Sequence, residues 1–285
     1  MDTELARTFL TVVAAGNFSQ ASSRLFITQS TVSARIATLE EQLGCRLFVR
    51  NKAGTSLTPA GFRFQNYAIT LVRTIERARQ DIGVVRGYRA SVTIGGRFGL
   101  WEDLLLPCLP LIRKVVGEVA IRAEIGFEDE LMQGLVEART DIGVMYTPQR
   151  RPGMVVEELF EERLVYVSSM RDHTQPPGND YVYVDWGPEF ASQHNAAFPE
   201  FDGAALAANI GWIGLQHIIA HGGAGFFPLR LAKDELVMGR LHRRPDVPEF
   251  ILPAYLVHLA DPNPDTVGRA IQVIRDAAAE IAATG

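Results

Sequence analysis

Residues 18–50, FSQASSRLFITQSTVSARIATLEEQLGCRLFVR, contain two short helical patterns joined by an apolar junction. In the second pattern apolar residues recur every three or four positions, which places them on one helix face: Val32, Ile36, Leu39 and Leu43. Thr28 is suited to cap the start of this helix, and Gly44 is suited to end it. The spacing predicts a helix-turn-helix, although other three-helix bundles produce similar stripes.

The face of this helix away from the stripe carries short or amide-bearing side chains. A helix that enters the DNA major groove needs small side chains for close approach and hydrogen-bonding groups for base edges. Gln29 can pair with adenine, and Ser33 can reach a base or a phosphate. Arg35 lies beside the stripe, so we expect it to reach a phosphate or an acidic neighbour. Residues 45–58 then predict a wing of two strands around a basic turn at Arg50–Lys52.

Charge supports a polyanion partner for this part of the chain. The protein has 285 residues and a net charge of −5, but residues 1–90 hold twelve Lys/Arg against six Asp/Glu, which leaves −11 for the remainder. A cationic third on an acidic protein favours nucleic acid as its partner, the alternative being an inert solvated surface. The composition, 47% hydrophobic, excludes disorder and predicts two or three domains.

Targeting and disulfide signals are weak. The N-terminus is acidic where a signal peptide would be basic, and no window reaches the roughly 18 apolar residues of a membrane span. Cys45 and Cys108 lie far apart in the sequence, so they predict neither a disulfide framework nor a CxxC metal site. We therefore expect a cytoplasmic protein that needs no cofactor and does not enter a membrane.

Together these motifs resemble the winged helix-turn-helix of LysR-type transcriptional regulators. The likeness runs position by position over residues 1–66 and includes the TQS opening, the I-x-x-L-E-x-x-L-G-x-x-L-F-x-R run and the T-P-A-G segment. It implies that the exposed face of the second helix and the wing lie at double-stranded DNA. The residues expected there are Thr28, Gln29, Ser30, Ser33, Ala34, Arg35, Arg50, Asn51 and Lys52.

A long helix is predicted next. Thr58 and Pro59 form a cap and a first-turn proline, and an apolar heptad pattern follows. Its members, which predict a seam, are Phe64, Ala68, Leu71, Ile75, Ala78, Ile82 and Val85. Such a seam packs either on its own chain or on a partner helix. We favour self-association because a two-fold DNA site needs two DNA-binding domains. The resemblance implies a homodimer or a homotetramer.

From Ser91 onward, short β-rich runs alternate with helical patterns, which predicts parallel sheets in two lobes joined by crossing strands. The fold class is α+β multidomain. We expect a winged helix-turn-helix at 1–58, a linker and dimerisation helix at 59–89 and an effector domain at 90–285. Lobe 1 is assigned 90–161 and 266–285, and lobe 2 is assigned 162–265. The resemblance implies that this domain is similar to a periplasmic binding protein, with a small molecule between its lobes.

Ligands of such folds bind beyond the carboxyl ends of strands. The residues selected by this rule are Arg97, Phe98, Gly99, Leu100, Trp101, Tyr146, Thr147, Trp186, Phe190, Ser192 and Gly223. Arg97 can hold an anionic group, and Phe98 or Trp101 can stack on a flat ligand. Trp101 and Trp186 can equally be core residues. The expected effector is an anionic or aromatic small molecule.

Other functions have less support. His217 and His221 have the spacing of zinc ligands, but Ile218 stands where H-E-x-x-H has its glutamate, so no metal is expected. No G-x-S-x-G or G-x-G-x-x-G segment indicates an enzyme. A ligand-independent regulator with a vestigial cleft remains the alternative. The segments MDTEL, GLWED and WGPEF resemble the branch of the family that includes a regulator of the flagellar master operon.

Overall fold

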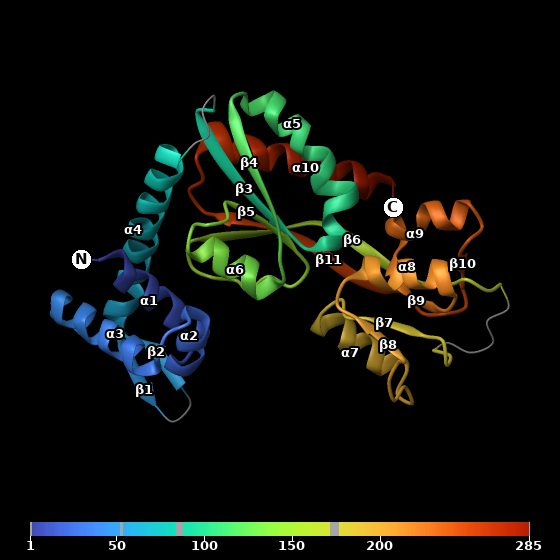
Figure 1. The fold of residues 1–285 in the computed structure, drawn as a ribbon, viewed down its shortest axis with the longest axis horizontal. Coiled ribbons are helices and arrows are strands. Elements are labelled where there is room, and N and C mark those ends of the chain that lie inside the picture. The colour runs from blue at the N-terminus through green and yellow to red at the C-terminus, as the bar shows by residue number, and fades with distance from the viewer. Residues whose placement is uncertain (1, 52–53, 84–87, 172–176, 285) are drawn as a thin grey trace.

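The computed structural model describes residues 2–51, 54–83, 88–171 and 177–284. It begins with a compact head made of three helices and a two-stranded antiparallel wing (Figure 1). The elements of the head are α1 (Thr3–Ala15), α2 (Phe18–Leu25), α3 (Gln29–Leu43), β1 (Phe48–Asn51) and β2 (Gly54–Leu57). The long helix α4 (Pro59–Gly83) leads from the head toward the effector domain.

The predicted stripe of α3 builds the core of the head. Val32, Ile36 and Leu39 are buried against α1 and α2, whereas Leu43, at the last turn, is 38% exposed. Thr28 caps α3, because its hydroxyl accepts a hydrogen bond from the amide of Thr31 at 3.2 Å. Gly44 ends the helix in the left-handed region at φ 66°, as its position predicts.

The first part of the predicted dimerisation seam packs on its own chain. Phe64 and Ala68 are buried in the core of the head, and the Phe64 ring lies edge-on to Phe9 with centroids 5.0 Å apart. Assigning these two residues to a partner helix was wrong, because α1 supplies the apolar surface that the heptad spacing requires. Leu71 packs on the same core, Ile75 is half-buried and Ala78 is exposed. The Ile82 side chain and Val85 lie outside the described part of the chain.

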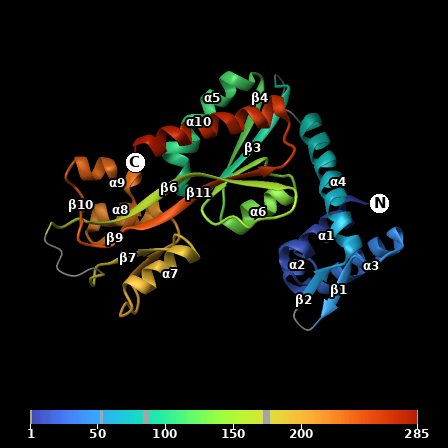
Figure 2. The same ribbon diagram turned by 180° about the vertical axis from the view of Figure 1, so that it is seen from behind.

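The effector domain begins with the predicted βαβαβ unit. Strand β3 (Ala90–Gly96) pairs in parallel with β4 (Val119–Ile125) and β5 (Ile142–Met145). The crossovers contain α5 (Leu106–Val116) and α6 (Glu128–Val136). Helix α5 lies beside α10 (Arg269–Thr284) on one face of the sheet, and α6 lies on the other (Figures 1 and 2).

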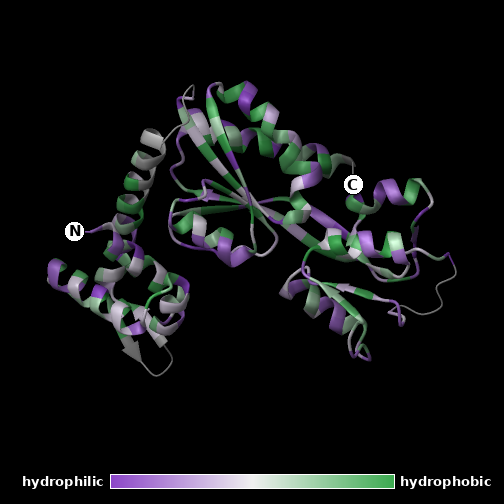
Figure 3. Cartoon of the chain, viewed as in Figure 1, coloured by the Kyte–Doolittle hydropathy of each residue, from purple (hydrophilic) through white to green (hydrophobic). Residues whose placement is uncertain are grey.

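Two long strands carry the chain across both lobes. The strands β6 (Met154–Ser168) and β11 (Phe250–Leu259) pair antiparallel along their lengths, and β11 also pairs with β5. Residues 255–258 therefore pair with β5 of lobe 1, whereas the sequence boundary placed them in lobe 2. Both lobes share one seven-stranded sheet, whose strands and covering helices α5 and α10 carry recurring hydrophobic residues (Figure 3).

Lobe 2 surrounds the far end of these strands. It adds β9 (Ala224–Pro228) and β10 (His242–Arg243) to the shared sheet and a separate parallel pair, β7 (Val182–Val184) with β8 (Leu206–Ala208). Its helices are α7 (Pro188–Ala197), α8 (Gly211–His221) and α9 (Leu229–Val237). Among the described helices of the whole chain, none combines the length and hydropathy needed to span a membrane.

Candidate DNA interface and effector cavity

The outer face of α3 carries the small polar side chains that were predicted to face DNA. Gln29, Ser30 and Ala34 are exposed, and Ser33 is half-buried. The Thr28 hydroxyl lies 2.8 Å from the Ser30 hydroxyl, so part of this cluster is pre-oriented by the helix cap. Small, uncharged side chains leave the α3 backbone free to approach a groove closely.

Arg35 was expected to reach either a phosphate or an acidic neighbour, and in this structure it contacts an acidic neighbour. Its guanidinium donates to Glu4 at 3.2 Å and to the Thr8 hydroxyl at 3.3 Å, both on α1. In this structure the side chain thus ties α3 to α1 instead of extending toward solvent. Any DNA contact by Arg35 would have to compete with that pair.

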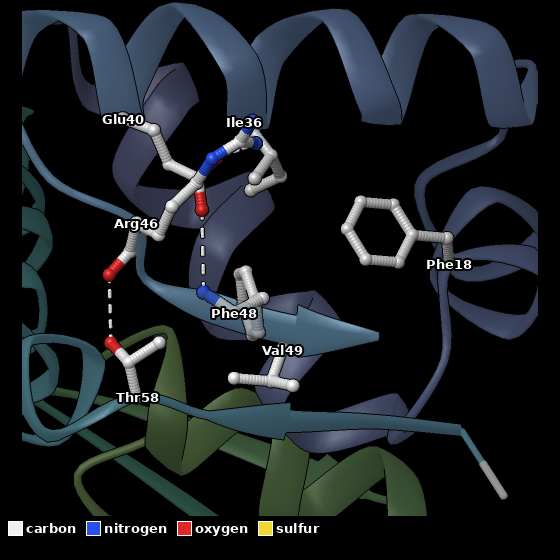
Figure 4. Close-up of a pocket in the computed structure, with 7 residues that line it drawn as sticks. All are labelled: Phe18, Ile36, Glu40, Arg46, Phe48, Val49 and Thr58. Carbon is white, nitrogen blue, oxygen red and sulfur yellow. Dashed lines mark hydrogen bonds and ion pairs between the residues drawn. The ribbon is translucent and has the colours of Figure 1, made fainter. Parts of the chain in front are cut away.

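The wing is joined to α3 by Glu40, a residue that the sequence reasoning did not select. Its buried carboxylate accepts from the amides of Leu47 at 2.7 Å and Phe48 at 3.3 Å, while Arg46 donates to the second oxygen at 2.9 Å. Thr58 closes the base of the wing by donating to the carbonyl of Arg46 at 2.7 Å (Figure 4). The lining residues of the hollow beside this clamp, about 370 Å³, are Phe18, Ile36, Glu40, Arg46, Phe48, Val49 and Thr58.

The wing tip is described only in part. Arg50 and Asn51 end β1, where they pair with Thr55 and Gly54. The side chains of Arg50 and Asn51 and the whole of Lys52 lie outside the described residues.

A small cavity lies between the lobes, beyond the ends of β3, β4, β5 and β8. Its volume is about 90 Å³. Five of the eleven predicted effector residues line it: Arg97, Phe98, Gly99, Tyr146 and Trp186. The lining residues that were not selected are Ile125, Gly126, Phe127, Glu130, Asn209, Ile210 and Gly211. They follow β4 and β8, so applying the strand-end rule to those two strands would have found them.

The other six predicted residues do not line this cavity. Leu100 and Phe190 are buried in the core, and the Trp101 indole turns away to donate to the carbonyl of Glu124 at 3.2 Å. These aromatic and aliphatic side chains serve packing, which is their commoner use. Thr147 is half-buried and Ser192 is exposed outside the cavity, while the Gly223 amide donates to the Ser169 hydroxyl at 3.0 Å in a different hollow.

Arg97 is the one cation among the residues that line the cavity. Only 8% exposed, it lies 3.5 Å from the Glu128 carboxylate and stacks 4.6 Å from the centroid of the Phe127 ring. Across the cavity, α8 begins at Gly211 without a side-chain cap. A Cβ at Gly211 would lie 2.2 Å from the Trp186 ring, so glycine allows this close approach. Arg97 and the N-terminal amides of α8 both favour an anion.

A buried ion pair lies behind the cavity and joins the lobes. Arg230, on α9, donates to Glu162 at 3.1 Å, to Asp103 at 3.0 Å and to the carbonyl of Gly99. Tyr146 donates to the same Glu162 carboxylate at 3.2 Å. Burial raises the pKa of Glu162 and that of Tyr146, and the carboxylate raises the pKa of Arg230 against the effect of burial.

The remaining candidate residues show no comparable arrangement. His217 and His221 lie on α8 with ring centroids 5.1 Å apart, and no group of three potential metal ligands gathers within the described ranges. Cys45 is exposed, whereas Cys108 is buried, and burial raises the pKa of its thiol to about 11. A thiol with so high a pKa is a poor nucleophile at neutral pH.

A winged helix-turn-helix followed by a two-lobed domain with a cavity defines a ligand-responsive DNA-binding regulator. Two family models match, "Bacterial regulatory helix-turn-helix protein, lysR family" over residues 3–62 and "LysR substrate binding domain" over residues 86–177. The chain is 30% identical over 272 residues to the HTH-type transcriptional regulator HdfR of Yersinia pestis, covering 91% of each. The chain belongs to the LysR family of transcriptional regulators, and this relative agrees with the branch that MDTEL and WGPEF indicated.

Solved structures support the same fold over the full chain. Full-length LysG of Corynebacterium glutamicum with the bound effector Arg is 20% identical and has a TM-score of 0.59, with 98% of this chain and 99% of that chain covered. DarR of Vibrio fischeri in complex with DNA is 18% identical and has a TM-score of 0.56, with 97% and 99% covered. The predicted order of head, linker helix and effector domain is thereby confirmed.

Proposed function

We propose that this regulator binds a two-fold operator as a homodimer or homotetramer, through the outer face of α3 and the wing, and that a small carboxylate in the inter-lobe cavity controls this binding. It acts in the cytoplasm and catalyses no reaction. The observation that supports the DNA side most directly is the exposed, uncharged face of α3 bounded by Gln29, Ser30 and Ala34.

Base readout is assigned to α3, and backbone contact is assigned to the wing. Gln29 is exposed at the first position of α3, where recognition helices present side chains to base edges. Its amide can form a bidentate pair with adenine. We assign Arg50 and Lys52 to the phosphate backbone, where their charge contributes to binding of every sequence.

Gln29→Ala is expected to weaken binding to the operator by about 1–3 kcal/mol and to relax preference at one base pair. Lys52→Ala should instead weaken binding to all duplexes and lower the salt dependence. Genome-wide footprinting of the purified protein first identifies an operator. The labelled operator and its single-base variants are then titrated with each protein. Gln42→Ala, an exposed glutamine in the last turn of α3, is the matched control. An equal loss on every sequence would contradict the role of Gln29.

The cavity favours a small carboxylate for reasons of size and charge. Its volume of about 90 Å³ corresponds to roughly three water molecules, so a bulky ligand would require the lobes to open. Arg97 and the uncapped start of α8 supply positive potential, and Phe98 and Trp186 supply apolar walls. The carboxylate of Glu130 also lines the cavity, where it accepts from the Phe127 amide at 3.2 Å, so the ligand carboxylate is assigned to the Arg97 and α8 side. Related LysG binds Arg, and an amino acid presents the same kind of carboxylate.

A panel of small carboxylates and amino acids should therefore raise the melting temperature of the protein and change its tryptophan fluorescence, because Trp186 forms a wall of the cavity. Arg97→Gln should abolish the response to any active compound. Arg122→Gln removes an exposed arginine of β4 and should leave the response intact. If no compound in the panel changes either signal, or if Arg97→Gln responds like the wild type, the effector assignment is contradicted.

A further inference from the structure

Helix α6 lies between the inter-lobe cavity and the DNA-binding head. The residues that lead into it, Ile125 to Phe127, line the cavity together with Glu130 of its first turn. At its other end, Val136 is 5% exposed and is buried in the hydrophobic cluster of the head, apart from the main core of its own domain. One helix of nine residues therefore contacts both functional parts of the protein.

The cavity end of α6 is held by charge. Glu128, its first residue, lies 3.5 Å from the Arg97 guanidinium, and Phe127 packs under the same group. Arg97 is the group that a ligand carboxylate would take as its partner. A ligand bound to Arg97 therefore competes directly with the first residue of α6.

The opposite side of α6 is held by the head. The Gln133 amide donates to the Thr11 hydroxyl of α1 at 3.4 Å, and Arg24 of α2 lies 3.8 Å from the Asp129 carboxylate. Asp129 follows Glu128 directly in the sequence. Glu128, which pairs with Arg97, and Asp129, which lies near Arg24 of the head, are thus neighbours in one helical turn.

Asp129 also neutralises a repulsive contact. Arg151 donates to Gln149, and Gln149 donates to Asp129 at 3.4 Å, which brings a second arginine close to Arg24. Burial, followed by the charge of Arg24, lowers the pKa of Arg151. If Asp129 moves away, two arginines on opposite sides of the contact face each other with less compensation, which favours separation of the head from lobe 1.

We propose that α6 transmits occupancy of the cavity to the DNA-binding head: a carboxylate that takes Arg97 releases Glu128, shifts Asp129 away from Arg24 and loosens the contact between α1 and α6. This inference rests on the proposed function, because it assumes a carboxylate ligand at Arg97. A nine-residue helix moves as one rigid body, so a displacement at its first turn reaches Gln133 and Val136.

A double-mutant cycle tests the coupling without a ligand. Arg24→Gln, Arg97→Gln and the double variant are titrated with an operator duplex recovered by footprinting. Arg97 and Arg24 have no contact with each other, so their effects on Kd should multiply unless α6 connects them. We expect the double variant to deviate from that product by about fivefold or more. Arg97→Lys keeps the positive charge but loses the guanidinium that stacks on Phe127, so its deviation should be smaller than that of Arg97→Gln.

Arg163→Gln is the control partner for Arg24→Gln, because it removes an ion pair with Glu249 in the other lobe. The effects of these two substitutions on Kd should multiply to within about twofold. The same result for Arg97 and Arg24 overturns the proposal. Hydrogen exchange on the free full-length protein is an independent measurement, in which Arg97→Gln should speed exchange across residues 128–137. If the wild type binds no duplex, the proposed function fails. The exchange measurement still tests the coupling in that case, and exchange of Arg97→Gln equal to that of the wild type across residues 128–137 overturns it.

Discussion

Arg230→Ala is expected to lower the free energy of unfolding of the effector domain by about 3–5 kcal/mol. The reason is the carboxylate that it leaves behind. Glu162 is 3% exposed, and within the described part of the chain Arg230 is the cation that pairs with it. Removing the guanidinium strands a buried charge and also breaks the contacts to Asp103 and Gly99 that join α9 to lobe 1. Thermal and urea unfolding followed by circular dichroism measure the loss.

The deficit of Arg230→Ala should depend on pH. Burial already raises the pKa of Glu162, and loss of Arg230 removes the group that opposes this rise. A carboxyl whose folded pKa lies above its unfolded value, about 4.3, destabilises the fold increasingly as pH rises above the unfolded value. The variant should therefore be closest to the wild type near pH 4 and furthest from it near pH 8.

Two further variants separate the buried charge from a general loss of packing. Adding Glu162→Gln to Arg230→Ala removes the stranded carboxylate, so the double variant should be more stable than Arg230→Ala alone and should lose the pH dependence. Arg240→Ala removes an exposed arginine paired with Glu235, and its unfolding midpoint should stay close to that of the wild type at every pH. A deficit independent of pH in Arg230→Ala would contradict the explanation based on Glu162.

The head could be predicted closely from the sequence because its signals are local. The stripe of Val32, Ile36 and Leu39, the cap at Thr28 and the stop at Gly44 all act within one helix, and the structure confirms each of them. The seam on α4 shows the limit of such patterns. Heptad spacing indicates that an apolar face is covered, but it does not indicate which element covers it. In this chain α1 covers Phe64.

The effector cavity was predicted less completely because it depends on which strand ends meet in space. The rule that ligands bind beyond strand ends selected Arg97 and Trp186, which line the cavity, yet it also selected Leu100 and Phe190, whose side chains turn into the core. The ion pair of Glu162 with Arg230 joins residues 68 positions apart on different elements. No periodicity relates two such residues, so only the tertiary structure shows the pair.

Glu40→Ala is expected to abolish stable binding to every duplex, because it detaches the wing from α3. The carboxylate satisfies two buried amides of the polypeptide that enters the wing, and leaving such groups unpaired costs about 1–3 kcal/mol each. Hydrogen exchange over residues 45–58 should rise sharply. Operator titration at several salt concentrations should show lost affinity on specific and random sequences alike.

Two further substitutions, at Glu40 and at its neighbour Glu41, test whether the loss of binding in Glu40→Ala comes from the clamp on the wing. Glu40→Gln keeps one carbonyl oxygen for the two amides but loses the charged contact to Arg46, so its loss should be intermediate. If this variant retains base preference while the salt dependence falls, the wing has lost its phosphate contacts and α3 still reads the groove. Glu41→Ala, an exposed carboxylate on the same helix, should leave affinity within about twofold of the wild type. Equal losses from Glu40→Ala and Glu41→Ala would contradict the assignment of the effect to the clamp on Leu47 and Phe48.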